Sequence, residues 1–180
     1  MKSKILALLV LVTLFSCKEE PKSDAVAAPV EEAPKDFEVK INVVAKKDDS
    51  FHLFYTEDGT INFTEQKSVW VEFKGNEAAQ DIVFKLPEDV IPTHMRLDFG
   101  VNKQQEDIKM NSFEIDYMNG KIVANGAEFF SYFYPNEKCT KIDAEKSLII
   151  PIKGGDVYTG PMFYPQVVLS EKIEALVKGK

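Results

Sequence analysis

The chain has 180 residues and a formal net charge of −7 at pH 7, with 22 basic and 29 acidic side chains. A protein of this acidity lacks the positive surface that nucleic acids require, so we expect no nucleic-acid partner. It also has no electrostatic attraction for an anionic membrane surface.

The N-terminal region has the layout of a secretory signal. Lys2 and Lys4 precede an apolar run over residues 5–15, which is too short to span a bilayer. The run ends in Leu-Phe-Ser-Cys at residues 14–17, and charged residues follow immediately. The ordinary signal peptidase prefers small residues at its cut site, so this boundary indicates a different kind of processing.

The boundary resembles the lipobox of bacterial lipoproteins, in which the cysteine is lipidated and becomes the new N-terminus. The resemblance implies that residues 1–16 are a signal peptide and that Cys17 is the lipidation site. Acyl chains contribute about 0.8 kcal/mol per buried methylene, and more than one chain makes a durable membrane anchor. The alternative is that Cys17 is an ordinary residue of a signal segment.

The next residues, Lys-Glu-Glu at 18–20, are similar to the export signal of surface lipoproteins in the Bacteroidota. That resemblance implies an outer-membrane lipoprotein of the cell envelope that faces outward. The alternative is a solvated run of charged residues at the start of a linker. In that case the sequence does not indicate whether the protein faces the periplasm or the outside. Removal of the signal leaves 20 basic and 29 acidic side chains, a net charge of −9, so lipid rather than charge must hold the protein at the membrane.

Residues 18–36 are rich in proline, alanine and glutamate and contain no aromatic residue. Such a composition is typical of a disordered tether, which at this length spans roughly 25 Å. We therefore expect residues 17–36 to form a lipidated spacer and residues 37–180 to form one folded domain.

Apolar and polar side chains alternate from Phe37 onward, which is typical of strands with one buried face. Glycine, asparagine and proline mark turns between these segments. The pattern predicts an all-β fold, an antiparallel β-sandwich. Once Cys17 is lipidated, Cys139 has no internal disulfide partner, so the domain must depend on its hydrophobic core. The predicted strands cover residues 37–43, 68–73, 81–86, 94–99, 113–118 and 148–152.

Residues 129–134, Phe-Phe-Ser-Tyr-Phe-Tyr, are predicted to form a strand that is apolar on both faces. Either both faces are covered by other parts of the protein, or one is an exposed aromatic stripe that stacks on sugar rings. Buried core is the default interpretation of these rings.

A short C-terminal helix is predicted after Ser170, whose side chain would cap it. Ile173, Leu176 and Val177 would share its buried face, and Gly179 would end it.

The sequence contains no catalytic motif, and we predict a protein that is not an enzyme and has no cofactor. His52 and His94 fall outside the spacings of zinc sites, and there is neither a nucleophile elbow nor a P-loop. A hydrolase with an unrecognised carboxylate pair is an alternative, but 29 acidic residues give no way to select the pair. A calcium site is a second alternative to an ordinary acidic loop, with oxygen ligands from Asp98, Asn102, Glu106 and Asp107.

Trp70 is the only tryptophan, and strand alternation places it on the polar face of its strand. It is either a binding surface or is covered by a neighbouring loop or tail, and the covered position is the default interpretation. The other aromatic residues that we consider as ligand-binding candidates are Tyr132, Tyr134 and Tyr158.

Two further stretches carry a resemblance. Residues 51–75 pair a strand ending in Leu-Phe-Tyr with a Phe-Thr-Glu segment before the next strand, and Met-Arg-Leu-Asp-Phe-Gly at 95–100 precedes residues 108–115. The order resembles the galactose-binding-like accessory domains that accompany bacterial cell-surface glycan enzymes. The resemblance implies a jelly-roll sandwich, although no catalytic domain follows in this chain.

These observations predict a lipid-anchored, non-catalytic envelope protein that binds glycan through surface aromatic residues. Carboxylates would accept hydrogen bonds from sugar hydroxyl groups. The alternative is a structural or protein-interaction subunit of an envelope complex, which docks through an aromatic patch.

Overall fold

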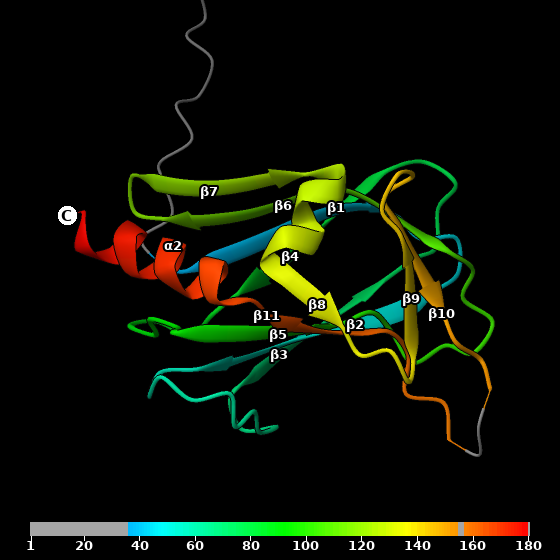
Figure 1. Ribbon diagram of the computed structural model, residues 1–180, viewed down its shortest axis with the longest axis horizontal. Helices are drawn as coiled ribbons and strands as arrows, with labels where there is room; N and C mark the ends of the chain where they lie inside the picture. The colour runs from blue at the N-terminus through cyan, green and yellow to red at the C-terminus, as the bar shows by residue number, and fades with distance from the viewer. Residues whose placement is uncertain (1–35, 155–156, 180) are drawn as a thin grey trace, which may run out of the picture. The chain divides into compact units, whose positions relative to one another are not determined.

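The computed structural model describes residues 36–154 and 157–179. The predicted signal peptide, the lipidation of Cys17 and the tether lie outside these residues. The described part consists of two antiparallel sheets packed as a sandwich, with a short C-terminal helix (Figure 1). The predicted all-β sandwich is therefore confirmed.

The first sheet has six strands and contains β1 near its centre. Five of its strands follow the order β4-β1-β6-β10-β9, and the sixth strand, β7, pairs with β6. An amide hydrogen bond of 2.9 Å from Asn111 to Asn42 joins β6 to β1 across 69 residues of chain. The strands are β1 (Glu38–Val44), β4 (Gln80–Lys85), β6 (Ile108–Tyr117), β7 (Gly120–Asn125), β9 (Thr140–Asp143) and β10 (Leu148–Pro151).

The second sheet has five strands in the order β3-β2-β5-β11-β8, so that β3 and β8 are its two edges. The chain passes repeatedly from one sheet to the other, as β1 precedes β2 and β5 precedes β6. The strands are β2 (Asp49–Thr56), β3 (Ser68–Phe73), β5 (His94–Asp98), β8 (Phe133–Pro135) and β11 (Met162–Pro165).

Aromatic side chains dominate the core between the sheets. Phe113 on β6 makes edge-to-face contacts with Phe129 and Phe133, whose ring centroids lie 5.9 and 5.2 Å away. The buried apolar side chains of the described residues lie between Phe37 and Ile173, so this part of the chain contains its own core. The fully buried phenylalanines are Phe37, Phe51, Phe84, Phe99, Phe113, Phe129, Phe133 and Phe163.

The prediction of a strand over residues 129–134 was wrong. A 3-10 turn, Gly126–Glu128, leads into the helical turn α1 (Phe129–Tyr132), and only then does β8 begin. The helical spacing buries both Phe129 and Tyr132, three residues apart on one face, whereas Tyr134 on β8 is exposed. Tyr132 and Tyr134 therefore do not share a face, as a continuous strand would require.

The predicted C-terminal helix is present, but its predicted start was wrong. The helix α2 (Val167–Lys178) begins after Gln166, whose extended backbone makes it the N-cap residue, and Ser170 lies inside the helix. The helix ends at Gly179 as predicted. It packs beside β7 and α1 at one side of the sandwich (Figure 1).

Among residues 36–154 and 157–179, the helices are too short and too polar to cross a bilayer.

Candidate functional site

The outward surface of the five-stranded sheet carries a group of aromatic and charged side chains, which we call the aromatic face. The strand register places Trp70 opposite His52, His52 opposite Asp98, and Asp98 opposite Met162. A neighbouring row continues through Phe54, Arg96, Tyr164 and Tyr134. With Phe63 from the loop between β2 and β3, the aromatic face comprises His52, Phe54, Phe63, Trp70, Arg96, Asp98, Tyr134, Met162 and Tyr164.

Trp70 lies on this face with one side of its ring open to solvent. Its indole stacks on the imidazole of His52, with ring centroids 3.7 Å apart and an angle of 20° between the planes. His52 is only 1% exposed, whereas Trp70 is 50% exposed. Of the two interpretations of Trp70, the structure therefore shows the exposed one. The ring is held flat against the sheet by a buried partner, which leaves its outer side exposed to solvent.

A second aromatic pair occupies the opposite edge of the sheet. Tyr134 on β8 stacks on Tyr164 on β11, with centroids 5.8 Å apart and planes inclined by 23°. Tyr134 is 45% exposed. Phe63 lies between the two edges, 6.5 Å from Phe54 and 6.3 Å from Tyr164, measured between ring centroids.

An ion pair fills the middle of the face. Arg96 donates from Nε to Asp98 Oδ1 at 2.8 Å and from Nη2 to Asp98 Oδ2 at 2.5 Å. The guanidinium carbon lies 4.5 Å from the centre of the Phe54 ring and 5.4 Å from that of Tyr164. Burial raises the pKa of Asp98, although the hydrogen bonds from Arg96 oppose this effect. The pair is electrically neutral when both groups are ionised, and it fixes the rings on either side.

His52 is uncharged in this environment. Burial, assisted by the positive charge of Arg96, lowers its pKa from 6.5 to about 4. Its Nε2 atom is buried without a hydrogen-bond partner, and the nearest carboxylate oxygen, Glu65 Oε2, is 3.8 Å away. The neutral imidazole stacks on Trp70 without the cost of burying a cation.

We expect stability to fall in mild acid because of His52. The unfolded chain binds a proton at His52 near pH 6.5 but the folded chain only near pH 4, so acid favours the unfolded state in this interval. Relative to His52→Phe, the wild-type domain should lose about 3 kcal/mol of unfolding free energy between pH 7 and pH 4. Urea denaturation of both proteins across this range measures the difference. Parallel pH profiles would contradict the prediction.

The structure separates the other two predicted aromatic residues from Trp70 and Tyr134. Tyr132 is 3% exposed, and its ring centroid lies 6.4 Å from that of Phe113. Its ring therefore belongs to the core and is not available to a ligand. Tyr158 is half-buried in the connection between β10 and β11, and burial raises the pKa of its phenol. Its hydroxyl group is buried without a hydrogen-bond partner.

Three of the four residues considered as calcium ligands, Asp98, Asn102 and Glu106, each interact with a different partner. Asp98 is bound by Arg96 on the aromatic face, and Glu106 pairs with Lys47 at 2.9 Å. The amide of Asn102 donates to the backbone carbonyl of Asp48. Within the described parts of the chain, no group of three or more histidine, cysteine, aspartate or glutamate side chains has the geometry to hold a metal ion.

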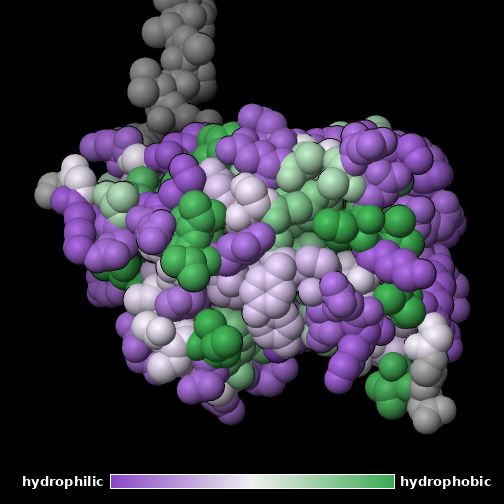
Figure 2. Space-filling view, viewed as in Figure 1, coloured by the Kyte–Doolittle hydropathy of each residue, from purple (hydrophilic) through white to green (hydrophobic). Residues whose placement is uncertain are grey.

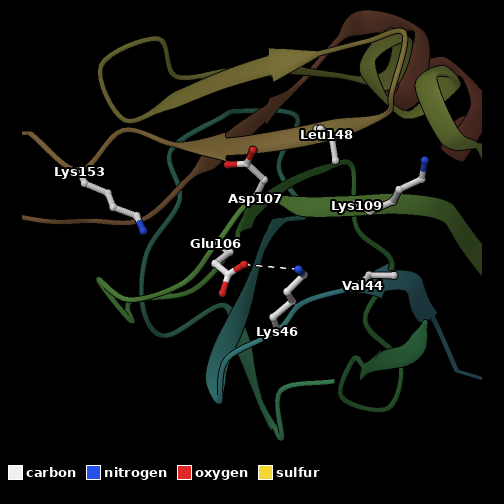
Figure 3. Close-up of a pocket in the computed structure, with 7 residues that line it drawn as sticks. All are labelled: Val44, Lys46, Glu106, Asp107, Lys109, Leu148 and Lys153. Atoms are coloured by element: carbon white, nitrogen blue, oxygen red, sulfur yellow. Dashed lines mark ion pairs between the residues drawn. The ribbon is translucent and has the colours of Figure 1, made fainter. Parts of the chain in front are cut away.

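Two of the hollows in the described part of the chain lie away from the aromatic face. One, of about 590 Å³, is lined by Lys46, Glu106 and neighbouring residues (Figure 3), and these two form an ion pair, with Lys46 Nζ 3.4 Å from Glu106. The other, of about 420 Å³, lies between α2 and residues 91–94. Figure 2 shows one side of the domain, on which hydrophobic side chains form separate small groups between hydrophilic ones. Neither hollow combines stacked rings with polar groups as the aromatic face does.

Sequence reasoning found Trp70 and Tyr134 but missed their partners. His52 and Phe54 lie on β2, which is buried on both faces and therefore shows no alternation. The sequence contains one signal for this arrangement: β2 is apolar on both faces, which indicates that side chains cover its outer face as well as its inner one. Arg96 and Asp98 lie two residues apart on one strand face; this spacing contributed to the family resemblance, but the ion pair between them was not predicted.

Comparison of the chain with models of protein families, with curated proteins and with solved structures gave no significant match.

Proposed function

We propose that this protein is a lipid-anchored, non-catalytic protein of the cell envelope whose domain binds glycan through the aromatic face. The observation that carries the proposal is the Trp70 ring, half exposed and stacked flat on buried His52. A sugar ring presents C–H groups on its flat sides, and these pack favourably on the negative face of an aromatic ring.

Polar groups suited to sugar hydroxyls lie beside that ring. Glu72 is two residues from Trp70 on the same side of β3, and Glu65 approaches His52 from the adjoining loop. Both carboxylates are exposed and free to accept hydrogen bonds from hydroxyl groups. Flat apolar contact combined with a few oriented acceptors is what recognition of a sugar requires.

The sequence adds two supports. The lipobox-like boundary at Cys17 and the acidic run after it resemble those of exported lipoproteins. The sandwich architecture agrees with the resemblance to galactose-binding-like accessory domains, and we propose a jelly roll of that kind. In this proposal the binding surface is a sheet face rather than a loop.

Replacing Trp70 by alanine should weaken glycan binding about 5- to 150-fold, because stacking on one aromatic ring contributes about 1–3 kcal/mol. Affinity electrophoresis of the domain, residues 32–180, in gels containing soluble polysaccharides measures retention. Trp70→Phe should keep part of the retention. Val123→Ala removes an exposed apolar side chain from the other sheet and should change nothing. Equal retention of wild type and Trp70→Ala by every polysaccharide would contradict the proposal.

Replacing Cys17 by serine should move the full-length protein from the membrane fraction to the soluble fraction. Serine cannot carry the thioether-linked lipid, and the acidic chain has no electrostatic attraction for the membrane. Cell fractionation with immunodetection measures the shift, and Cys139→Ala is the matched control because Cys139 is a buried residue of the domain. Membrane retention of a Cys17→Ser variant from which residues 1–16 have been cleaved would exclude a lipid anchor at this position.

A second candidate is docking onto another envelope protein. It is favoured by the composition of the aromatic face, in which Trp70, Arg96 and Tyr134 are residue types enriched at protein interfaces. Cross-linking in intact envelopes, followed by purification, should then yield one stoichiometric partner that Trp70→Ala loses.

A further inference from the structure

The two most exposed rings of the aromatic face lie at opposite edges of the five-stranded sheet. Trp70 is on β3 and Tyr134 is on β8, and β2, β5 and β11 separate them. With neighbouring strands about 4.8 Å apart, and a shift of one row along the strands, the two rings lie about 20 Å from each other. A single sugar therefore cannot contact both rings, whereas a chain of several sugars can.

The rings between these edges form a continuous series. His52 lies under Trp70 and is 3.8 Å from Phe54, measured between ring centroids. Phe54 contacts Phe63, Phe63 contacts Tyr164, and Tyr164 stacks on Tyr134, each within 6.5 Å. The series crosses the sheet perpendicular to its strands. His52 and Phe54 are buried, so they support the series from below. The aromatic surface that a ligand can reach is that of Trp70, Phe63, Tyr164 and Tyr134.

The charges on this path do not suit an anion. The guanidinium of Arg96 is already neutralised by two hydrogen bonds to Asp98. His52 is buried and has a lowered pKa, so it is neutral at physiological pH. The carboxylates of Glu65 and Glu72 lie beside the Trp70 end and would repel a carboxylate, sulfate or phosphate group.

We infer that the aromatic face binds one extended, uncharged glycan chain, which crosses the strands from Trp70 to Tyr134 over Phe63. This inference rests on the proposed glycan-binding function and adds the class of ligand: a linear neutral polymer rather than a single sugar or an acidic polysaccharide. The two edge rings act as separate contact points on one chain, so each adds to the affinity only when the ligand is long enough to reach it.

Isothermal titration of the domain, residues 32–180, with linear neutral oligosaccharides of graded length tests the inference. The probes are cello-, xylo-, manno- and malto-oligosaccharides, the corresponding soluble polysaccharides, and alginate and polygalacturonate as acidic polymers. Affinity should rise with length until the chain spans the face. Trp70→Ala should weaken binding of short and long ligands alike. Tyr134→Ala should weaken the long ligands at least tenfold and leave the short ones within twofold.

Matched variants separate contact with the ligand from effects on folding. Trp70→Phe and Tyr134→Phe keep a ring at each edge; Trp70→Phe should keep part of the binding, and Tyr134→Phe should bind nearly as the wild type does. Val123→Ala, on the other sheet, should bind as the wild type does. Thermal unfolding of every variant checks that the domain is intact, since both rings are exposed and make few core contacts.

The failures are distinguishable. Loss of binding in Trp70→Ala, together with full binding of long chains by Tyr134→Ala, would overturn the extended site and leave the proposed function standing. Tighter binding of alginate or polygalacturonate than of neutral chains would overturn the inference that the ligand is uncharged. If the wild type binds none of the ligands, the proposed function fails, and this inference fails with it.

Discussion

Replacing Phe113 by alanine is expected to lower the free energy of unfolding by about 3–5 kcal/mol, the usual cost of truncating a fully buried phenylalanine. Phe113 is 0% exposed and lies where the six-stranded sheet meets α1 and β8. The vacated space is bordered by the rings of Phe129, Tyr132 and Phe133, which pack edge to face around it. Bulky rings cannot collapse into such a space, so the cavity persists. Urea denaturation of the domain, residues 32–180, measures the loss.

Tyr134→Ala is the control for this experiment, because it also removes an aromatic ring close to α1 but from an exposed position. Its cost should stay near 0.5 kcal/mol or below. If Phe113→Ala and Tyr134→Ala lowered the free energy of unfolding by similar amounts, the buried ring of Phe113 would contribute no more to stability than an exposed ring does.

Replacing Arg96 by methionine is expected to cost about 3 kcal/mol, the lower end of the range for breaking a buried ion pair. The lower end applies because the side chains of Arg96 and Asp98 remain 18% and 13% exposed. Methionine retains apolar contact with Phe54 but leaves the Asp98 carboxylate buried without its counter-charge. The pKa of Asp98, already raised by burial, should rise further. Urea denaturation at several pH values measures both effects.

The sign of the pH dependence follows from that rise. Between the pKa of Asp98 in the unfolded chain and its higher pKa in the folded variant, the folded state binds more protons, so stability falls as the pH increases. The double variant Arg96→Met/Asp98→Leu removes both charges and should recover most of the loss. A double variant no more stable than Arg96→Met would show that the interaction between the two charges is not the cause.

The strands that alternate were predictable because one face of each is buried and the other solvated. The segments over residues 68–73 and 94–99 match β3 and β5 closely for this reason. The prediction failed where that contrast is absent. Residues 129–134 are apolar at nearly every position, so the same letters fit a strand with two covered faces or a helical turn, and packing against Phe113 decides for the turn.

The start of α2 was missed for a different reason. Ser170 is a preferred N-cap residue, but Gln166 precedes Val167, and the helix begins there without a side-chain hydrogen bond to its cap. Burial of Leu169 in the core adds a turn before Ser170. Local capping preference is worth about 1 kcal/mol, and burial of a leucine outweighs it.

The residues of the aromatic face could not be brought together by reasoning from the sequence. Trp70 could be placed on the polar side of its strand, but its stacking partner His52 depends on which strands pair and in which register. Tyr134 and Tyr164 meet because β8 lies at the edge beside β11, about thirty residues later in the chain. Such neighbours follow from topology rather than from local patterns.

The position of β1 has a consequence for how quickly the domain folds. β1 lies between β4 and β6, and its contact with β6 closes a loop of 69 residues. Such loops must close before most strand pairs can form and stabilise the domain. We therefore expect folding on the millisecond-to-second scale that is usual for β-sandwiches. β1, the first strand of the described domain, therefore stays unpaired on one edge until β6 becomes available. During that interval β1 is open to pairing with other chains, which makes it a segment at risk of aggregation.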